Sequence, residues 1–214
     1  MANLFSSYSG EFFEGFKFTL YASILALIFS LIIGTLMAIF QLSHNSVIRS
    51  LAKAYVAFFR NIPLLIIVMF FYVVAPMYFY SFDGFQAGTI GLTIYTSAFI
   101  AETVRSGIQT VPKGQMEAGL SSGFSYAETM RYIVLPQAFK IVVPPLGNQF
   151  INLIKNSSIL AMVAGLDLMY QGDLIASTTF NTFDTYIIVG LFYLVLTLPL
   201  SYLMNYLDKH WASV

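Results

Sequence analysis

The sequence predicts an all-α integral membrane protein, a single domain over residues 1–214 that crosses the bilayer about five times. Its composition is 58% hydrophobic and 9% charged, whereas soluble domains carry about 25% charged residues. The mean hydropathy of +0.77 is too high for a surface that faces only water. A membrane-spanning helix needs about 20 apolar residues in succession, and the chain holds several largely uncharged stretches of that length.

The predicted spans are separated by polar or charged residues. Arg60 lies near the start of the second span and Glu102 near the end of the third. Prolines inside a span are tolerated when neighbouring helices satisfy the freed backbone groups. The spans are expected at about residues 18–40, 54–80, 86–108, 141–154 and 185–207, with Pro63 and Pro76 in the second and Pro144 and Pro145 in the opening turns of the fourth.

Three glycines at helical spacing stand at the entry to the third span. Gly84, Gly88 and Gly91 would share one face of a helix and let a second backbone approach closely. The alternative is that they form only a loop and its exit.

Charge bias predicts the orientation, because cytoplasmic segments of membrane proteins carry an excess of Lys and Arg. One set of connecting segments is basic: Arg49, Lys53, Arg60, Arg105, Lys113, Arg131, Lys140 and Lys209. The opposite set is acidic, with Lys17 its one basic residue: Glu11, Glu14, Asp83, Asp167, Asp173 and Asp184. The N-terminus is therefore expected outside, and the C-terminus and residues 109–140 in the cytoplasm.

Several function classes are excluded or disfavoured. Lys and Arg balance Asp and Glu at ten each, so no basic field indicates nucleic acid. The sequence has no P-loop, no cysteine, and only two isolated histidines, His44 and His210. No serine lies in a plausible arrangement with a histidine and an acid. We therefore expect no catalytic residues, no metal site and no ATP hydrolysis by this chain itself.

The longest polar interruption, residues 109–140, predicts two short helices that form a compact knob. Pro112 suits the first turn of a helix that reaches about Leu120. Residues 121–123 then break it. The knob would offer Met116, Leu120 and Phe124 to a cytoplasmic partner, although a solvated loop that merely joins two spans is the alternative.

The second helix of the knob has its own start and stop signals. Ser125-x-x-Glu128 predicts a capping box, in which the side chain of each residue accepts a hydrogen bond from the backbone N–H of the other. The helix is expected over residues 126–134. Pro136 should end it, because proline disfavours helical geometry at the preceding Leu135.

Four motifs in this region and its flanks resemble those of ABC importer permeases. Glu117-Ala118-Gly119, Gly123 and Ile133-x-Leu135-Pro136 keep every spacing of that family's EAA loop, with Gly119 where alanine is usual. Three further segments resemble the polar amino acid branch of the family: Phe59-Arg60-Asn61-Ile62-Pro63-Leu64-Leu65, Ala101-Glu102-x-x-Arg105-x-Gly107-Ile108 and Leu153-Ile154-Lys155-Asn156-Ser157-Ser158.

The resemblance implies a type I importer permease fold in the bacterial cytoplasmic membrane. It implies an ABC ATPase dimer that holds ATP and Mg, a second permease subunit in a homodimer or heterodimer, and an extracytoplasmic solute-binding protein. This chain would bind no cofactor. The knob would then be the coupling element of the ATPase, with Met116, Glu117, Ala118 and Gly123 as its contact and turn residues. Glu117 would fix the position of the knob on the ATPase more than it would raise their affinity, since an exposed ion pair contributes about 0–1 kcal/mol.

Polar residues within a predicted span are candidates for a translocation path. Asn148, Asn152 and Lys155 share one face of the fourth span, and Gln149 and Asn156 widen it. The amides would bond the solute and Lys155 would attract its carboxylate. The alternative is a polar seam that seals two permease subunits together.

The remaining span charges are expected to be structural. Glu102 and Lys155 lie at different depths, so Glu102 should pair with Arg105 or Arg60 near the cytoplasmic face, as a structural or gating link. Without a carboxylate beside Lys155, the solute is expected to be a neutral or acidic polar amino acid such as glutamine or glutamate. A secondary carrier or channel without an ATPase, and a non-transporting assembly factor, are the rival hypotheses.

Overall fold

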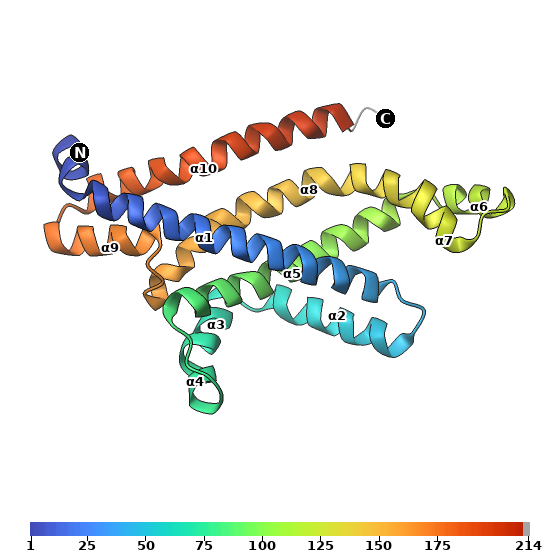
Figure 1. Ribbon diagram of the computed structural model, residues 1–214, viewed down its shortest axis with the longest axis horizontal. Coiled ribbons are helices and arrows are strands. Elements are labelled where there is room, and N and C mark those ends of the chain that lie inside the picture. The colour runs from blue at the N-terminus through green and yellow to red at the C-terminus, as the bar shows by residue number, and fades with distance from the viewer. Residues whose placement is uncertain (212–214) are drawn as a thin grey trace.

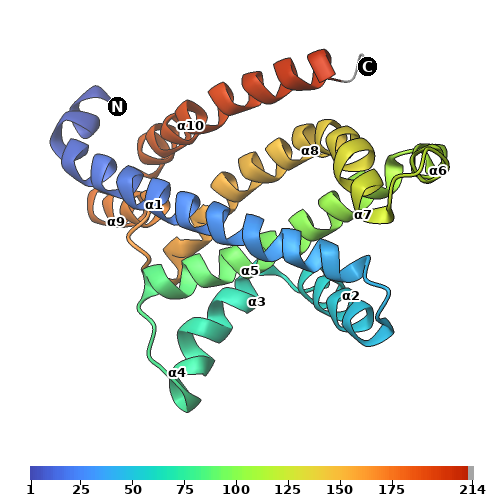
Figure 2. The ribbon, with the colours of Figure 1, turned by 45° about the vertical axis from the view of Figure 1, so that its right-hand side comes forward.

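The computed structural model describes residues 1–211, which fold into helices joined by short turns, with no strand in that range (Figure 1). The all-α prediction is therefore confirmed. The long helices are α1 (Ala2–Gln41), α5 (Gly84–Thr110), α8 (Leu135–Asn156) and α10 (Thr182–Trp211). They run lengthwise through the molecule, and α1 crosses α5 and α8 in the views of Figures 1 and 2.

Two helices among residues 1–211, α1 and α10, are long and apolar enough to cross a membrane unaided. Two bent pairs pass the same test together, which gives up to four candidate spans. One pair joins Ser46–Asn61 to Leu64–Tyr78 at 105°, and the other joins Tyr126–Val163 to Leu168–Thr179 at 50°. Helix α5, which contains the predicted third span, lies outside this set, so the count of five spans stays a prediction.

The second predicted span is not one straight helix. Helix α2 (Ser46–Asn61) stops at Ile62, whose φ of −100° and ψ of 136° are extended. Extended backbone is what proline imposes on the residue before it, and Pro63 follows. Beyond the break, α3 (Leu64–Met69), a π turn and α4 (Ala75–Tyr78) form an arm that leaves the bundle sideways (Figures 1 and 2).

Helix α5 is the centre of the bundle and contacts α1, α2, α3 and α8. Small residues allow α1 to approach it closely: a Cβ on Gly34 would lie 2.7 Å from the Ser97 carbonyl oxygen. Hydroxyl groups of α5 bond to its own carbonyls, as when Thr93 donates to the Thr89 carbonyl at 2.7 Å. A helix enclosed in this way needs less apolar surface than one that faces lipid, which explains why α5 is less apolar than α1.

The glycines at the start of α5 make the close contacts that their spacing predicts. A Cβ on Gly84 would overlap the Val163 carbonyl oxygen. A Cβ on Gly88 would lie 2.5 Å from Leu160, and one on Gly91 would lie 2.7 Å from Val68. The alternative, a mere loop and its exit, is wrong, because these residues lie within α5.

We expect Gly84→Ala to destabilise the protein by about 1–3 kcal/mol, because the added methyl group must displace backbone atoms of the segment η3 (Ser157–Val163). The thermal unfolding midpoint in detergent measures the effect. Gly190→Ala is the matched control, since a Cβ there meets nothing within 4 Å. Equal midpoints for the two variants would contradict the close contact.

The helix that contains Pro136 does not end there, so that expectation is wrong. The chain passes from α7 (Tyr126–Thr129) through a π turn, η2 (Met130–Val134), directly into α8. Leu135 keeps helical angles of −61° and −40°. A π turn is wider than an α-turn and moves the preceding carbonyls away from the proline ring, so the helix continues. Pro144 and Pro145 consequently lie in the middle of α8 and not in its opening turns.

After α8 and η3 the chain reverses into α9 (Leu168–Thr179) and then α10. Buried Asp167 caps α9 by accepting hydrogen bonds from the backbone of Met169 at 3.1 Å and Tyr170 at 3.3 Å. Helix α9 and the N-terminus lie at one end of the molecule, and the knob lies at the opposite end (Figure 1).

Candidate functional site

The knob consists of α6 (Lys113–Ser121), α7 and η2. Helix α6 begins after Pro112, close to the predicted position, and ends in a left-handed turn at Gly123, whose φ is +87°. The backbone N–H of Phe124 donates to the Gly119 carbonyl at 3.2 Å, and that of Gly123 donates to the Leu120 carbonyl at 3.1 Å. This pair of bonds is a Schellman motif, which normally takes glycine at the left-handed position.

The predicted capping box is present at the start of α7. The backbone N–H of Glu128 donates to Ser125 Oγ at 3.3 Å, and that of Ser125 donates to Glu128 Oε2 at 2.8 Å. The Ser125 hydroxyl also donates to Glu128 Oε2 at 2.7 Å. This bond, together with the one from the Ser125 backbone N–H, favours the ionised carboxylate and holds the pKa of Glu128 below its usual range. The box fixes the angle at which α7 leaves the Gly123 turn.

The two helices of the knob pack on each other at Gly119. Its buried Cα faces Thr129, and a Cβ would lie 3.0 Å from Ile133 and still closer to Thr129. The glycine that departs from the family's usual alanine thus has a packing reason here. Beneath this contact lies an apolar cluster formed by Val111, Val134 and Ala138, with Ile108, Met116 and Met130 against it.

The four predicted coupling residues take different positions in the knob. Glu117 and Ala118 are exposed on α6, and within residues 1–211 no hydrogen bond or ion pair restrains Glu117. Met116 turns inward and lines an apolar groove of 290 Å³ between α6 and η2. Gly123 forms the turn. Leu120 and Phe124 are exposed, as the sequence predicts, and Tyr126 and Tyr132 are exposed beside them. The expectation that Met116 belongs to this apolar surface is wrong, because its side chain packs against the inner side of the knob.

The polar face predicted on α8 is exposed, and its two edges face different neighbours. Asn148, Asn152 and Lys155 are all exposed. On one edge, Asn152, Asn156 and Gln149 line a groove of 180 Å³ against α5, which we call the amide groove. On the other edge, Lys155 lines a separate recess with Tyr186 and Tyr193 of α10. Lys155 is therefore not part of the amide groove.

Helix α5 contributes the opposite wall of the amide groove through Tyr95, Thr96 and Phe99. These residues are absent from the sequence-based set of candidates. A signal for them exists, because Tyr95, Phe99, Glu102 and Ser106 recur every three or four residues on one face of the helix. The pattern includes aromatic residues, which occur both along a translocation path and in a packed helix interface, so the sequence alone does not assign the face to either.

The three charged residues expected to be structural do meet. Arg105 Nε donates to Glu102 Oε2 at 3.1 Å, and Arg105 Nη2 donates to Glu102 Oε1 at 2.5 Å. Arg60 Nη1 lies 4.0 Å from Glu102 Oε2. The pairing is as predicted, while its gating role stays a prediction.

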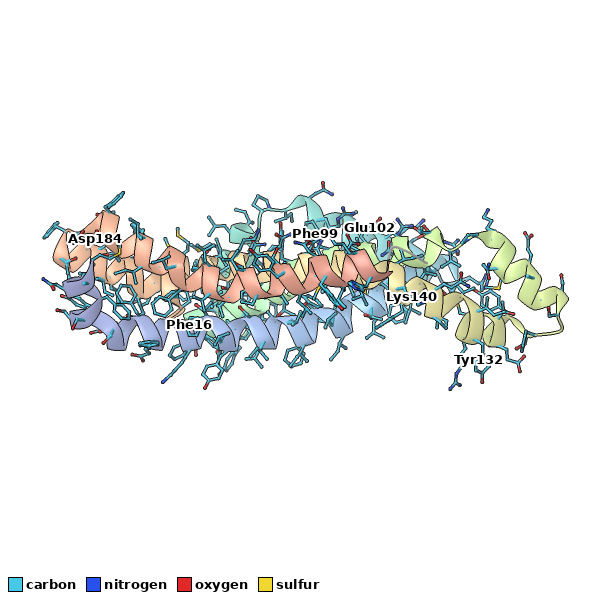
Figure 3. All side chains as sticks on the ribbon, turned by 90° about the horizontal axis from the view of Figure 1, so that it is seen from above. Phe16, Phe99, Glu102, Tyr132, Lys140 and Asp184 are labelled. Atoms are coloured by element: carbon cyan, nitrogen blue, oxygen red, sulfur yellow. The ribbon has the colours of Figure 1, made fainter. Side chains whose placement is uncertain are left out.

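Arg60 and Glu102 line a cleft of 330 Å³ between α2, α5 and α8, which we call the inner cleft. Phe99 and Gln149 line both the inner cleft and the amide groove, so the two adjoin each other. Figure 3 shows Phe99 and Glu102 near each other on the same side of the bundle, at some distance from the knob residue Tyr132. No group of three His, Asp or Glu residues suited to a metal ion occurs within residues 1–211.

Known proteins resemble this chain over nearly its whole length. A family described as binding-protein-dependent transport system inner membrane component matches residues 30–213. A protein named "Probable glutamine ABC transporter permease protein GlnM", from Bacillus subtilis, is 58% identical over 96% of this chain and 95% of its own length. The glutamine transport system permease protein GlnP of Escherichia coli is 35% identical over 92% of this chain and 90% of its own.

Solved structures agree with the sequence comparisons. The structure of an amino acid ABC transporter with histidines superposes with a TM-score of 0.91 at 35% identity, covering 96% of each chain. An inward-facing structure of the MetNI methionine ABC transporter superposes at 0.73 with 19% identity over 95% of each chain, which indicates a shared fold alone.

Proposed function

Because the chain belongs to the family of binding-protein-dependent transport system inner membrane components, we propose that it forms the translocation path of an ATP-driven importer for polar amino acids of the glutamine or glutamate type. As a member of this family with the type I importer permease fold, it is a membrane-embedded permease subunit of an ABC importer. The observation that carries the solute class is the amide groove, which offers Asn152, Asn156 and Gln149 without a charged side chain among its lining residues.

The solute fits the groove by its hydrogen-bonding chemistry. Amide side chains both donate and accept, so they match a solute that carries its own amide or carboxyl group. A groove without a carboxylate gives no partner to the side-chain cation of arginine or lysine. The names of the relatives from B. subtilis and E. coli, which specify glutamine, point the same way.

The knob supports a partnership with a cytoplasmic ATPase. Its outer surface presents exposed Glu117, Ala118, Leu120 and Phe124 on a framework fixed by the capping box and the Schellman motif. In this proposal Glu117 pairs with a basic residue of the ATPase and Gly123 sets the angle of contact. ATP and Mg belong to the ATPase dimer, and this chain holds no cofactor and no catalytic residue.

The arrangement of the ends supports the proposed orientation in a bacterial cytoplasmic membrane. The acidic N-terminal segment and α9 lie at one end, and the knob lies at the other (Figure 1). With five spans, the N-terminus is outside, where a solute-binding protein docks, and the knob is in the cytoplasm. The exposed face of α8 is also consistent with a second permease subunit, whether identical or different.

Reconstitution tests this function. The chain, produced with an ATPase and a binding protein encoded beside it and placed in liposomes, should take up radiolabelled L-glutamine only when ATP is present. The loaded binding protein should stimulate ATP hydrolysis. Uptake that proceeds equally without ATP would contradict the importer and favour a secondary carrier or channel.

A further inference from the structure

We propose that the inner cleft is a second solute-binding station, in which the Arg60 guanidinium binds the α-carboxylate of a zwitterionic amino acid beside Glu102. The inference rests on the proposed function, because it adds a station to the same path. It concerns the cytoplasmic side of that path, beyond the amide groove.

Arg60 has free hydrogen-bonding capacity in this cleft. Its Nη1 lies 4.0 Å from Glu102, at the outer limit of an ion pair, and its side chain is 40% exposed. Among residues 1–211 it makes no hydrogen bond, whereas Glu102 is held at two points by Arg105. The two hydrogen bonds from Arg105 thus neutralise the Glu102 carboxylate and leave the donors of Arg60 unused.

The guanidinium is nevertheless held in place. Its central carbon lies 5.3 Å from the centroid of the Phe99 ring, a cation–π contact that occupies none of its N–H donors with a hydrogen-bond acceptor. Arginine presents its donors as a planar fork that matches the two oxygens of a carboxylate. Because the contact with Phe99 restricts the guanidinium, Arg60 loses less conformational entropy on binding than an unrestrained arginine would.

The charge pattern of the cleft matches an amino acid more closely than a simple anion. A positive and a negative side chain stand 4.0 Å apart, as the carboxylate and ammonium of a zwitterion stand side by side. Two nearby hydroxyl groups already donate to the backbone, Thr103 to the Phe99 carbonyl at 3.0 Å and Thr110 to the Ser106 carbonyl at 2.9 Å. Their oxygens therefore remain as acceptors, which suit an ammonium group.

Size and position also suit a station on the path. The volume of 330 Å³ lies within the range of about 300–1,000 Å³ found for small-ligand sites. The amide groove adjoins the cleft at Phe99 and Gln149, and its lining holds no charged partner for the α-carboxylate. A solute that leaves the groove toward the knob would meet its first cation at Arg60.

The test uses the nucleotide-free complex of permease and ATPase in nanodiscs, without binding protein. Isothermal titration should show that wild-type complex binds L-glutamine at least about tenfold more tightly than 4-aminobutanamide, which is glutamine without its α-carboxylate. Arg60→Gln should weaken binding of L-glutamine about tenfold or more and leave binding of 4-aminobutanamide unchanged. Arg60→Lys should fall between, because lysine keeps the charge but not the fork.

Lys53→Gln is the matched control, because it removes a cation from α2 outside the inner cleft and should bind as wild type does. Equal affinity of wild type for the two ligands would overturn the proposal even if Arg60→Gln failed to assemble. The proposal would also be overturned if the Arg60→Gln complex bound L-glutamine with wild-type affinity, or if its affinity for both ligands fell by the same factor. ATP-driven glutamine uptake by wild type would leave the importer function intact in each of these cases, whereas its absence would contradict the function itself.

Discussion

Replacing Gly123 by aspartate is expected to abolish import while the chain stays in the membrane and its ATPase continues to hydrolyse ATP. The φ of +87° at this position is strained for any residue with a Cβ, at a cost of roughly 1–2 kcal/mol. A Cβ here would meet nothing within 4 Å, so the strain lies in the backbone and not in a clash. The turn can relieve this strain by reorienting α6 against α7, which would misplace the surface that we propose to face the ATPase.

Initial rates measure this effect in proteoliposomes. Glutamine uptake by Gly123→Asp should fall at least about tenfold, which corresponds to 1.4 kcal/mol, while ATP hydrolysis changes by less than about twofold. Gly114→Asp is the matched control, because it places the same side chain in open space on α6 without a positive φ. Gly123→Asn should be milder, since asparagine, like glycine, is found at this left-handed position and, unlike aspartate, adds no negative charge at the C-terminal end of α6. Normal uptake by Gly123→Asp would contradict the coupling role of the knob.

Replacing Asn152 by leucine is expected to reduce glutamine uptake at least about tenfold, because the amide groove loses its one exposed amide, and a solute group that bonded to it is left without a partner. Asn152→Gln keeps the amide and should restore part of the rate. Asn205→Leu removes an exposed amide from α10, away from the groove, and should leave uptake unchanged.

The same variant separates the two interpretations of the polar face on α8. If the face lines the path, Asn152→Leu raises the KM or lowers the rate of uptake while the permease pair stays assembled. If the face is a seam, light scattering of the purified complex will show dissociation of the two permease subunits. An assembled complex with unchanged uptake would remove Asn152 from both roles.

Local signals in the sequence were sufficient for several features of the fold and the site. The capping box at Ser125, the turn at Gly123 and the close contacts of Gly84 depend on residues near in sequence or on the absence of a side chain. The partners of Glu102 are also predictable from the sequence, because Arg105 lies one helical turn away and Arg60 is expected near the same membrane face.

Features that depend on tertiary context were not predictable in the same way. The helix continues past Pro136 because a π turn widens the backbone just before it, and no residue type specifies such a turn. Lys155 shares a helix face with Asn152, yet their recesses differ because α5 flanks one edge of α8 and α10 the other. Helical periodicity identifies a face but not the neighbours on either side of it.

The helix runs without a break from Tyr126 to Asn156, through the π turn and past Pro144 and Pro145, and connects the knob to the amide groove over about 45 Å of helix axis. At Gly147 this helix crosses α10 so closely that a Cβ would overlap Met204. Because one continuous helix joins the two places, a displacement of the knob would be carried along it to Asn152 and Asn156 without separate contacts in between. The close crossing at Gly147 would limit how far this helix can shift against α10.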